Sequence, residues 1–483
     1  MKHLVHAEWT KFRTVRGWVV GMVVAIPLTV LIGLLGPAGG GFHCAGPHGE
    51  KCAGQHPPTG PDGTPAFDAF YFVHRTLTGD GAITARVAAL EDAEPWAKAG
   101  VIVKRSTREG SAYASVLTTG AHGVRMQYDF TEDVAGPRSG QDSHWLRLSR
   151  AGNRLTGAVS PDGRMWTTIA TAEVDLGSSV EAGMFVASPQ HVDRDESFRS
   201  VTENSGPTVA TTTFDQVRTE GDWTPDWRGG RLGGEAPLAN GFTEDAGRFT
   251  ISGTGDIVPV VQSGGGLGRT VENALIGAFA GLIAVLVVAT MFVTSEYRRG
   301  LVRTSFAANP RRGQLLAAKA IVVGGVSFVV GVVSSALAIP LVERLEVAKG
   351  FYLYPVATWT EVRVVVGTGL LFGVAAVLAV AVGTLLRRGA GTVTAVTVGI
   401  VLPYLLAVAS VLPPAPAEWL TAVTPAAAFA VQQSVREYPQ VSASYTPADG
   451  FFPLSPAGGF AVLCGYAVAA VVLAAVALRK RDA

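Results

Sequence analysis

Residues Thr294–Lys319 read TSEYRRGLVRTSFAANPRRGQLLAAK and form a basic segment between two long apolar runs. Its cations are Arg298, Arg299, Arg303, Arg311, Arg312 and Lys319. Lys and Arg accumulate in the cytoplasmic loops of membrane proteins, so this segment predicts a cytoplasmic loop between two membrane spans. The break at Asn309-Pro310 is typical of a structured loop. We therefore expect the segment to present a folded surface to a soluble partner.

Working outward, the chain contains six apolar runs of a length that spans a membrane. Of its 483 residues, 48% are hydrophobic and only 16% are charged, which is too apolar for an ordinary soluble protein. A helix of about 20 residues crosses a hydrocarbon core of roughly 30 Å. Buried core helices are the alternative, but six uncharged runs flanked by Arg or Lys favour membrane spans. The runs are Gly17–Leu35, Ala274–Val293, Ala320–Leu341, Val364–Leu386, Gly391–Leu412 and Ala457–Leu478.

The basic residues outside the loop predict the orientation. Besides the loop, the clusters are Lys2, Lys11, Arg13 and Arg16, then Arg387 and Arg388, then Arg479, Lys480 and Arg481. All of them fall on one face if both termini are cytoplasmic. We therefore expect a multi-pass plasma-membrane protein whose region between spans one and two is external. A cleaved signal peptide fits the N-terminus less well, because no small-residue cleavage site follows the run. The first residues instead predict an interfacial helix, with Leu4, Val5, Trp9 and Phe12 facing lipid.

The region between the first two spans has a different period. From about Ala66, short segments alternate apolar and polar residues and are separated by Gly, Asp and Asn. That pattern predicts an antiparallel β-sandwich. The expected division is a helix and first span over 1–36, an external tether over 37–65, the sandwich over 66–220, a Gly-rich linker with possible extra strands over 221–270, and spans two to six over 271–483. Residues Pro413–Pro456 are expected to form a second exposed outer segment.

The tether contains soft metal ligands at short spacing. His43, Cys44, His48, Cys52 and His56 lie within GFHCAGPHGEKCAGQHPP. A disulfide between Cys44 and Cys52 is the favoured interpretation, because external thiols seldom stay reduced. The alternative is a zinc or copper site that uses the histidines as well.

Two features of the sequence bear on its energy source. It contains no G-x-x-x-x-G-K-[ST] phosphate loop, so we do not expect this chain to hydrolyse ATP or to be an enzyme. The six runs contain no Asp, Glu, Lys, Arg or His, groups that ion-coupled carriers usually need within the membrane. These features favour an external energy source, and no cofactor or nucleic acid is expected to bind this chain.

The membrane part resembles a type-2 ABC exporter membrane subunit of the actinobacterial kind. The likeness rests on EWTKFRTVRGW before span one, on the basic loop, and on the six-span layout. In that family the loop between spans two and three docks onto an ATPase subunit, which binds the ATP. The resemblance implies a second permease copy or homologue, and it implies coupling positions at Glu296, Tyr297, Arg298, Arg299, Gly300, Arg303 and Thr304. The alternative is a loop that only binds anionic membrane lipids.

The outer region resembles a concanavalin-A-like, or jelly-roll, β-sandwich over roughly Phe67–Val217. The likeness rests on FYFVHRTLTGDGAITARV, WAKAGVIVKR, WLRLSRAGNRLTGAVSPDGRMWTTIA and TFDQVR. It implies a fold and no particular activity. Trp96, Trp145 and Trp166 are expected in the core, with stacking on a sugar as the alternative. The other function to weigh is therefore a membrane-anchored glycan-binding sensor or structural protein that transports nothing.

Overall fold

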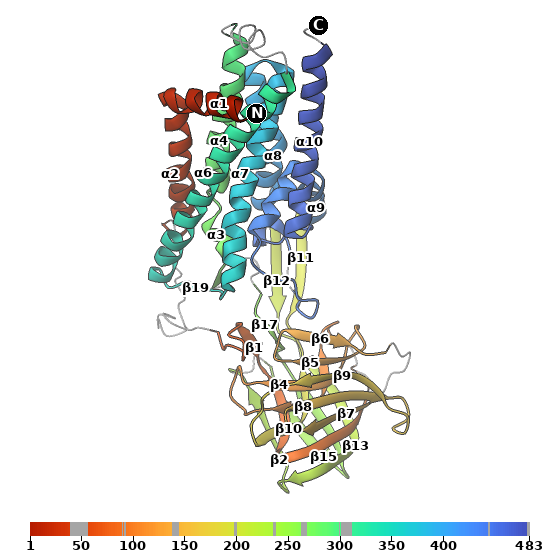
Figure 1. Cartoon of the computed structure of the whole chain (residues 1–483). Helices are drawn as coiled ribbons and strands as arrows, with labels where there is room; N and C mark the ends of the chain where they lie inside the picture. The colour runs from red at the N-terminus through yellow and green to blue at the C-terminus, as the bar shows by residue number, and fades with distance from the viewer. Residues whose placement is uncertain are drawn as a thin grey trace.

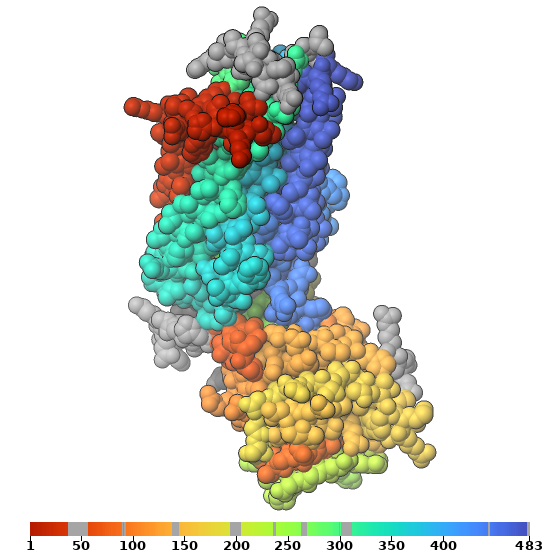
Figure 2. Space-filling view, viewed as in Figure 1, coloured from red at the N-terminus to blue at the C-terminus, as the bar shows by residue number. Residues whose placement is uncertain are grey.

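The computed structural model describes residues 1–38, 57–88, 90, 93–137, 144–197, 200–234, 238–261, 268–298, 300, 312–442 and 445–480; for 37–38, 194–197 and 200–203 it describes the backbone alone. Helices form one half of the molecule and a β domain forms the other (Figure 1). The two halves are stacked end to end, so that the molecule is elongated (Figure 2).

Within the described residues, six helices are long and apolar enough to cross a membrane, which confirms the predicted spans. They are α2 (Arg16–Ala38), α4 (Ala278–Arg298), α6 (Arg312–Ala348), α7 (Thr358–Leu386), α8 (Gly389–Val408) and α10 (Pro456–Lys480). Three shorter helices are α1 (Lys2–Thr14), α3 (Val271–Ala274) and α9 (Pro414–Val423). The chain is thus a multi-pass membrane protein by the length and composition of its helices.

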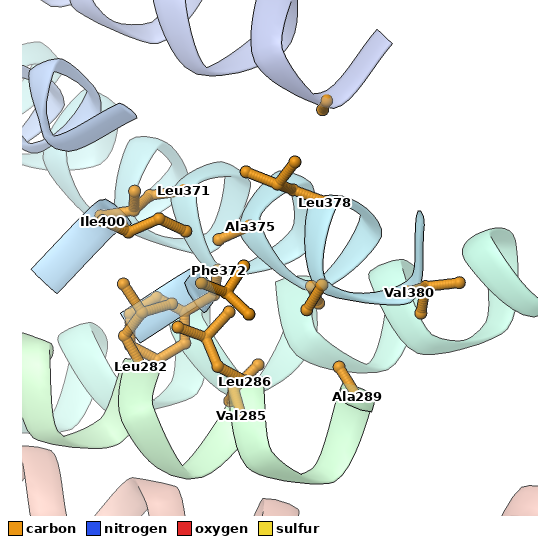
Figure 3. Close-up of a cluster of buried hydrophobic side chains, with 14 of the residues drawn as sticks. Leu282, Val285, Leu286, Ala289, Leu371, Phe372, Ala375, Leu378, Val380 and Ile400 are labelled. Atoms are coloured by element: carbon orange, nitrogen blue, oxygen red, sulfur yellow. The ribbon is translucent and has the colours of Figure 1, made fainter. Parts of the chain in front are cut away.

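The core of the bundle lies around α4 and α7. Leu282 and Leu286 of α4 pack close to Phe372 of α7, and Ile400 of α8 lies beside Leu371 (Figure 3). These side chains are fully buried. Glycines bring α6 and α7 into close contact, with Gly331 against Gly369 and Gly324 against Gly373. Small residues favour such packing in membranes because they let two helix backbones approach closely.

The helices extend beyond the apolar runs, and their ends carry charged residues. Helix α6 has 37 residues and includes Lys319 near its start and Glu343 and Glu346 near its end. Helix α4 continues to Arg298 and includes Glu296. The apolar runs in the sequence contain no ionisable group. That remains true of the middle of each span, but the complete helices do include charged residues near their ends.

One expectation about the outer segment is wrong. Residues Pro414–Val423 form α9, and Pro425–Gln432 form a 3-10 helix, η1, whose eight residues are all buried. Helix η1 packs against α10, where Gly459 leaves room for the carbonyl of Ala427. The small apolar side chains of PAAAFAV allow this segment to enter the bundle instead of lying exposed on its surface.

The β domain is a two-layered antiparallel structure built on one long strand. The first half of β2 pairs with β10 and the second half pairs with β7, so β2 contributes to both layers. Strands β3, β4 and β5 pack against β7, β8 and β9 across a core that includes Val101, Met184 and Leu148. The strands are β1 (Ala66–Asp68), β2 (Phe70–Val87), β3 (Lys98–Lys104), β4 (Tyr113–Thr119), β5 (Val124–Tyr128), β6 (Glu132–Ala135), β7 (His144–Ala151), β8 (Arg154–Ser160), β9 (Thr167–Glu173) and β10 (Ser179–Ala187). This arrangement confirms the predicted β-sandwich class.

The domain continues past Glu220, the boundary expected from the sequence. Strand β16 pairs with β13 and brings Phe249 and Ile251 into the core, and β17 pairs with β1. The later strands are β11 (His191–Ser197), β12 (Ser200–Gly206), β13 (Ala210–Trp223), β14 (Arg228–Leu232), β15 (Gly241–Asp245), β16 (Arg248–Gly253) and β17 (Ile257–Pro259). A short parallel pair, β18 (Gly268–Arg269) with β19 (Tyr352–Leu353), then joins the chain to the bundle.

Candidate functional site at the basic end of the bundle

One end of the helical bundle is basic, and both ends of the described chain lie there, opposite the β domain (Figure 1). We call it the basic end. Among the described residues, its exposed cations include Lys2, Arg13, Arg16, Arg298, Arg388, Arg479 and Lys480. Helix α4 ends and helix α6 begins at this end. The described members of the predicted cationic clusters therefore lie at one end of the structure.

Helix α1 lies across the basic end and packs against α6 and α2 (Figure 1). Phe12 is 3% exposed and lies between Trp18 and Phe292, with ring centroids 6.4 and 5.9 Å away. Trp9, which was expected to face lipid with Phe12, is 43% exposed. The apolar face of α1 is thus divided, with Phe12 in the bundle core and Trp9 outside it.

Four charged side chains meet beneath α1, and we call them the charge cluster: Glu8 and Lys11 of α1, Glu296 of α4 and Lys319 of α6. Lys319 Nζ donates to Glu8 Oε2 at 2.9 Å and to Glu296 Oε1 at 2.6 Å. Lys11 forms an ion pair with Glu296. Two carboxylates and two ammonium groups balance, so the cluster joins three helices without a net charge.

Burial makes the charge cluster sensitive to any loss of a partner. Glu8, Glu296 and Lys319 are 7, 4 and 5% exposed. Burial, together with the neighbouring charge of Lys319, lowers the pKa of Lys11 to about 8. The ring of Phe292 lies 5.1 Å from Lys319 Nζ and stabilises the cation through its electron-rich face. Removing one member of a buried ion pair is strongly destabilising because it leaves an uncompensated charge.

Some of the predicted coupling positions are buried in the protein, and others are exposed on its surface. Glu296 is buried in the charge cluster, and Tyr297 is half-buried, with its ring 5.3 Å from the guanidinium of Arg387. Arg298 and Gly300 are exposed, and Gly300 has a left-handed φ of 69°. Arg299, Arg303 and Thr304 lie outside the described residues.

Sequence reasoning missed the cluster itself. The sequence pattern places Lys11 and Lys319 among the cations that flank separate spans, and it indicates no role for Glu8. The available signal was the position of Glu296 and Lys319, each close to the end of an apolar run and of opposite charge. Charges that near a span are expensive unless they are paired, and that cost points to partners inside the protein.

The other predicted sites are less informative. Cys44, Cys52, His43, His48 and His56 lie outside the described residues, so the disulfide and the metal alternative stay predictions. Within the described part of the chain, no group of three or more His, Cys, Asp or Glu residues is placed to hold a metal ion. Trp96 is 8% exposed and stacks on His122 at 3.9 Å, as expected of a core residue.

The opposite end of the bundle contains a polar clamp on the turn after η1. Glu272 of α3 accepts hydrogen bonds from the backbone N–H and the hydroxyl of Ser434. Arg363 of α7 donates to the carbonyls of Val431 and Gln433, at 3.2 and 2.5 Å. Burial raises the pKa of Glu272, and the bonds from Ser434 act against that rise. The clamp holds the buried η1 segment in the half of the bundle nearer the β domain.

Comparison with known proteins does not add an activity. No protein-family model matches the sequence, and no curated protein matches it. Among solved structures, the chain is similar to a functionally unknown protein from Saccharomyces cerevisiae, at 16% identity over 32% of this chain and 75% of that chain, with a TM-score of 0.21. It is also similar to scytalido-glutamic peptidase, at 7% identity over 40% of this chain and 100% of that chain, with a TM-score of 0.26. A third similar structure is SCP-B, a member of the Eqolisin family of peptidases, at 8% identity over 40% of this chain and 100% of that one, with a TM-score of 0.25. Scores this low assign no function to the chain.

Proposed function

We propose that the chain is the membrane-spanning permease subunit of an ATP-driven ABC transporter, an exporter, and that a separate ATPase subunit binds and hydrolyses the ATP. The observation that carries the proposal is the construction of the basic end. Helix α1 lies across it, and the charge cluster joins α1 to α4 and α6, the two helices that flank the basic loop. A helix held in this way serves to transmit movement, which a passive membrane anchor does not need.

In the proposed mechanism the ATPase docks on the exposed part of the loop. Arg298 and Gly300 are exposed at its start, and Arg299, Arg303 and Thr304 extend the same basic surface in the sequence. Glu296 and Tyr297 act from inside by fixing the end of α4. Because Glu296 and Lys319 are bonded to each other, a displacement of the loop moves α4 and α6 together with α1.

The orientation belongs to the same proposal. The basic end faces the cytoplasm, where the positive-inside tendency places Lys and Arg, and the β domain then lies outside the plasma membrane. The glycines between α6 and α7 provide the close contacts expected in a bundle whose helices move as units. A second permease copy or a homologue completes the pathway between two membrane halves.

The test exchanges one exposed cation for an acid at each of two places on the basic end. Arg298→Glu lies at the start of the loop, and Arg388→Glu lies in the turn between α7 and α8; both side chains are exposed. The two variants change the charge of the basic end equally. We expect Arg298→Glu to lose the ATPase subunit during gentle purification from the native membrane and Arg388→Glu to retain it.

The other outcomes separate the alternatives. A second outcome is that both variants insert into the membrane in the wrong orientation to the same extent, and that the wild-type protein binds no ATPase. That result would support a loop that binds only lipid headgroups. The membrane-anchored glycan-binding protein would then be the better interpretation, and the transport proposal would fail.

A further inference from the structure

A cavity of about 900 Å³ lies where the β domain meets the segment between η1 and α10. Its lining includes Phe67 of β1, Val192 of β11, and Val441 and Ser442 from the segment between η1 and α10. A bond from Gln440 Nε2 to the carbonyl of Phe130, 3.3 Å long, joins the two halves of the molecule near this place. The volume is within the range of sites that bind small molecules.

The apolar wall of the cavity contains side chains that a soluble domain would normally bury. Strand β1 alternates, with Ala66 and Asp68 buried and Phe67 47% exposed between them. Phe67 lies directly opposite Val258 of β17 in the sheet register. Val192, at the root of the β11–β12 hairpin, is 37% exposed. An aromatic ring and aliphatic side chains that face the same cavity favour an apolar ligand group.

The polar wall of the cavity contains two side chains of opposite charge, Arg231 and Glu109. Arg231 uses Nε and Nη1 to bind backbone carbonyls and Thr254 Oγ1, and Nη2 has no bonded partner among the described residues. Glu109 also lines the cavity, and the two side chains form no ion pair within the described part of the chain.

We propose that this cavity binds a phospholipid-like amphiphile whose headgroup carries both a phosphate and an ammonium group. The free guanidinium nitrogen of Arg231 binds the phosphate, since guanidinium groups match phosphate oxygens in geometry and charge. The carboxylate of Glu109 accepts from the ammonium group. The acyl chain lies on Phe67 and Val192. Such a site does not depend on the transport proposal, because binding is measured without any ATPase.

The experiment uses the full-length chain in nanodiscs of phosphatidylglycerol, which lacks an ammonium group. The probe is a lysophosphatidylethanolamine with a photoactivatable acyl chain, and mass spectrometry maps its adducts. We expect adducts on the peptides that contain Phe67 and Val192, and a loss of about tenfold in their yield for Phe67→Asp, as expected when one apolar contact is replaced by a charge. Met165→Asp is the matched control, because Met165 is apolar, 72% exposed and away from the cavity.

Two further arms test the headgroup. Arg231→Gln should lower the adduct yield at Phe67 and Val192, and a fatty acid with the same photoactivatable chain should label them less than the lysophospholipid does. Equal labelling by the two probes would overturn the zwitterionic headgroup. Adducts confined to the six long helices, or a yield unchanged by Phe67→Asp, would overturn the site. Size-exclusion elution and far-ultraviolet dichroism of each variant establish that it is folded.

Discussion

Two groups of buried charges set the local energetics of this chain. In the charge cluster, Lys319 bonds to both Glu8 and Glu296, so one side chain satisfies acids from two helices. In the β domain, Lys98 and Lys104 have fully buried side chains and pair with Asp256 and Asp68 at 2.6 and 2.5 Å. In each place a long lysine stem lies in apolar surroundings while its ammonium group meets a carboxylate. The charges are tolerated because they are paired.

We expect Lys319→Met to destabilise the protein by about 3–5 kcal/mol, because Glu8 and Glu296 then share one remaining cation in a buried place. Thermal unfolding in detergent, followed by the loss of the monodisperse peak, measures the effect. The double variant Glu8→Gln with Lys319→Met keeps the Lys11–Glu296 pair and restores neutrality, so it should be less destabilised than Lys319→Met alone. Lys349→Met is the control, since Lys349 is exposed; an equal loss there would contradict a special role for the charge cluster.

Asp129 should make the β domain less stable at neutral pH than at acid pH. It lies after β5 with a φ of 47°, and burial raises its pKa from 3.8 to about 6, while the bond from the Tyr113 N–H acts against that rise. Between these values the folded state binds a proton that the unfolded state has lost, so the free energy of unfolding falls as the pH rises. The penalty is complete above about pH 6.

Asp129→Asn should therefore stabilise the protein at pH 7–8 by about 1 kcal/mol, a figure reduced for partial exposure, and leave it nearly unchanged at pH 4. Asn tolerates the left-handed conformation and keeps an oxygen for the Tyr113 N–H. Chemical denaturation across this pH range measures the difference. Parallel pH profiles of the two proteins would refute the assignment.

Among the elements, η1 is the one whose position depends most on its neighbours. Its apolar sequence is too short to span a membrane, yet all eight residues are buried. Tyr404 of α8 stacks on Phe429 of η1 at 3.8 Å, α10 covers another side, and the polar clamp fixes its exit. A short helix that enters the bundle and turns back is tolerated only where protein surrounds it.

Gly459→Leu should displace η1, because a side chain at this position would overlap the carbonyl of Ala427. We expect a loss of several kcal/mol, as in other overpacked or strained sites. Gly465→Leu on the same helix is the control, since a Cβ at Gly465 meets no atom within 4 Å. The measurement is thermal unfolding of both variants in the same detergent; similar midpoints would show that the Gly459 contact is unimportant.

Considered as a whole, the molecule separates a basic membrane end from a β domain at the opposite end (Figure 1). The β domain follows α2 in the chain and precedes α4, so it is an insertion in the helical part of the sequence. Strands β1 and β17, at the two ends of the insertion, pair with each other. The domain is therefore closed where it joins the membrane part.

A segment covering 57–261 should fold alone as a soluble β protein, whereas 66–220 should not. The shorter segment lacks β16 and Asp256, which leaves Lys98 buried without its partner. Size-exclusion chromatography and far-ultraviolet dichroism of the two secreted segments provide the comparison. A folded, monomeric 66–220 segment would mean that β16 and β17 are dispensable.

The proposed orientation predicts which positions react with an impermeant thiol reagent. In a variant with Cys44, Cys52 and Cys464 replaced by Ser, cysteines at Thr107 or Ser442 should react in intact cells. A cysteine at Thr14 should react only after the membrane is opened. All three residues are exposed in the structure, so access depends on the side of the membrane. Reaction of the Thr14 position in intact cells would reverse the orientation.

Local sequence patterns were sufficient to predict the six spans and the β class of the inserted domain. Each span depends on the transfer of about 20 consecutive apolar residues into hydrocarbon, and each strand on an alternation that repeats every two residues. Both signals are local, so no knowledge of distant residues is required. The Gly-rich region after Glu220 carried a weaker signal, and its strands were only partly expected.

Which charges meet, and which apolar segment enters the bundle, depends on contacts between residues that are distant in the sequence. The charge cluster unites residues near positions 8, 296 and 319, and the β1–β17 pair unites the two ends of the inserted domain. Helix η1 looks like a loop in the sequence and is buried because Gly459, Tyr404 and Arg363 leave a place for it. Such contacts depend on how helices and strands pack in three dimensions, and the period of a single segment does not contain that information.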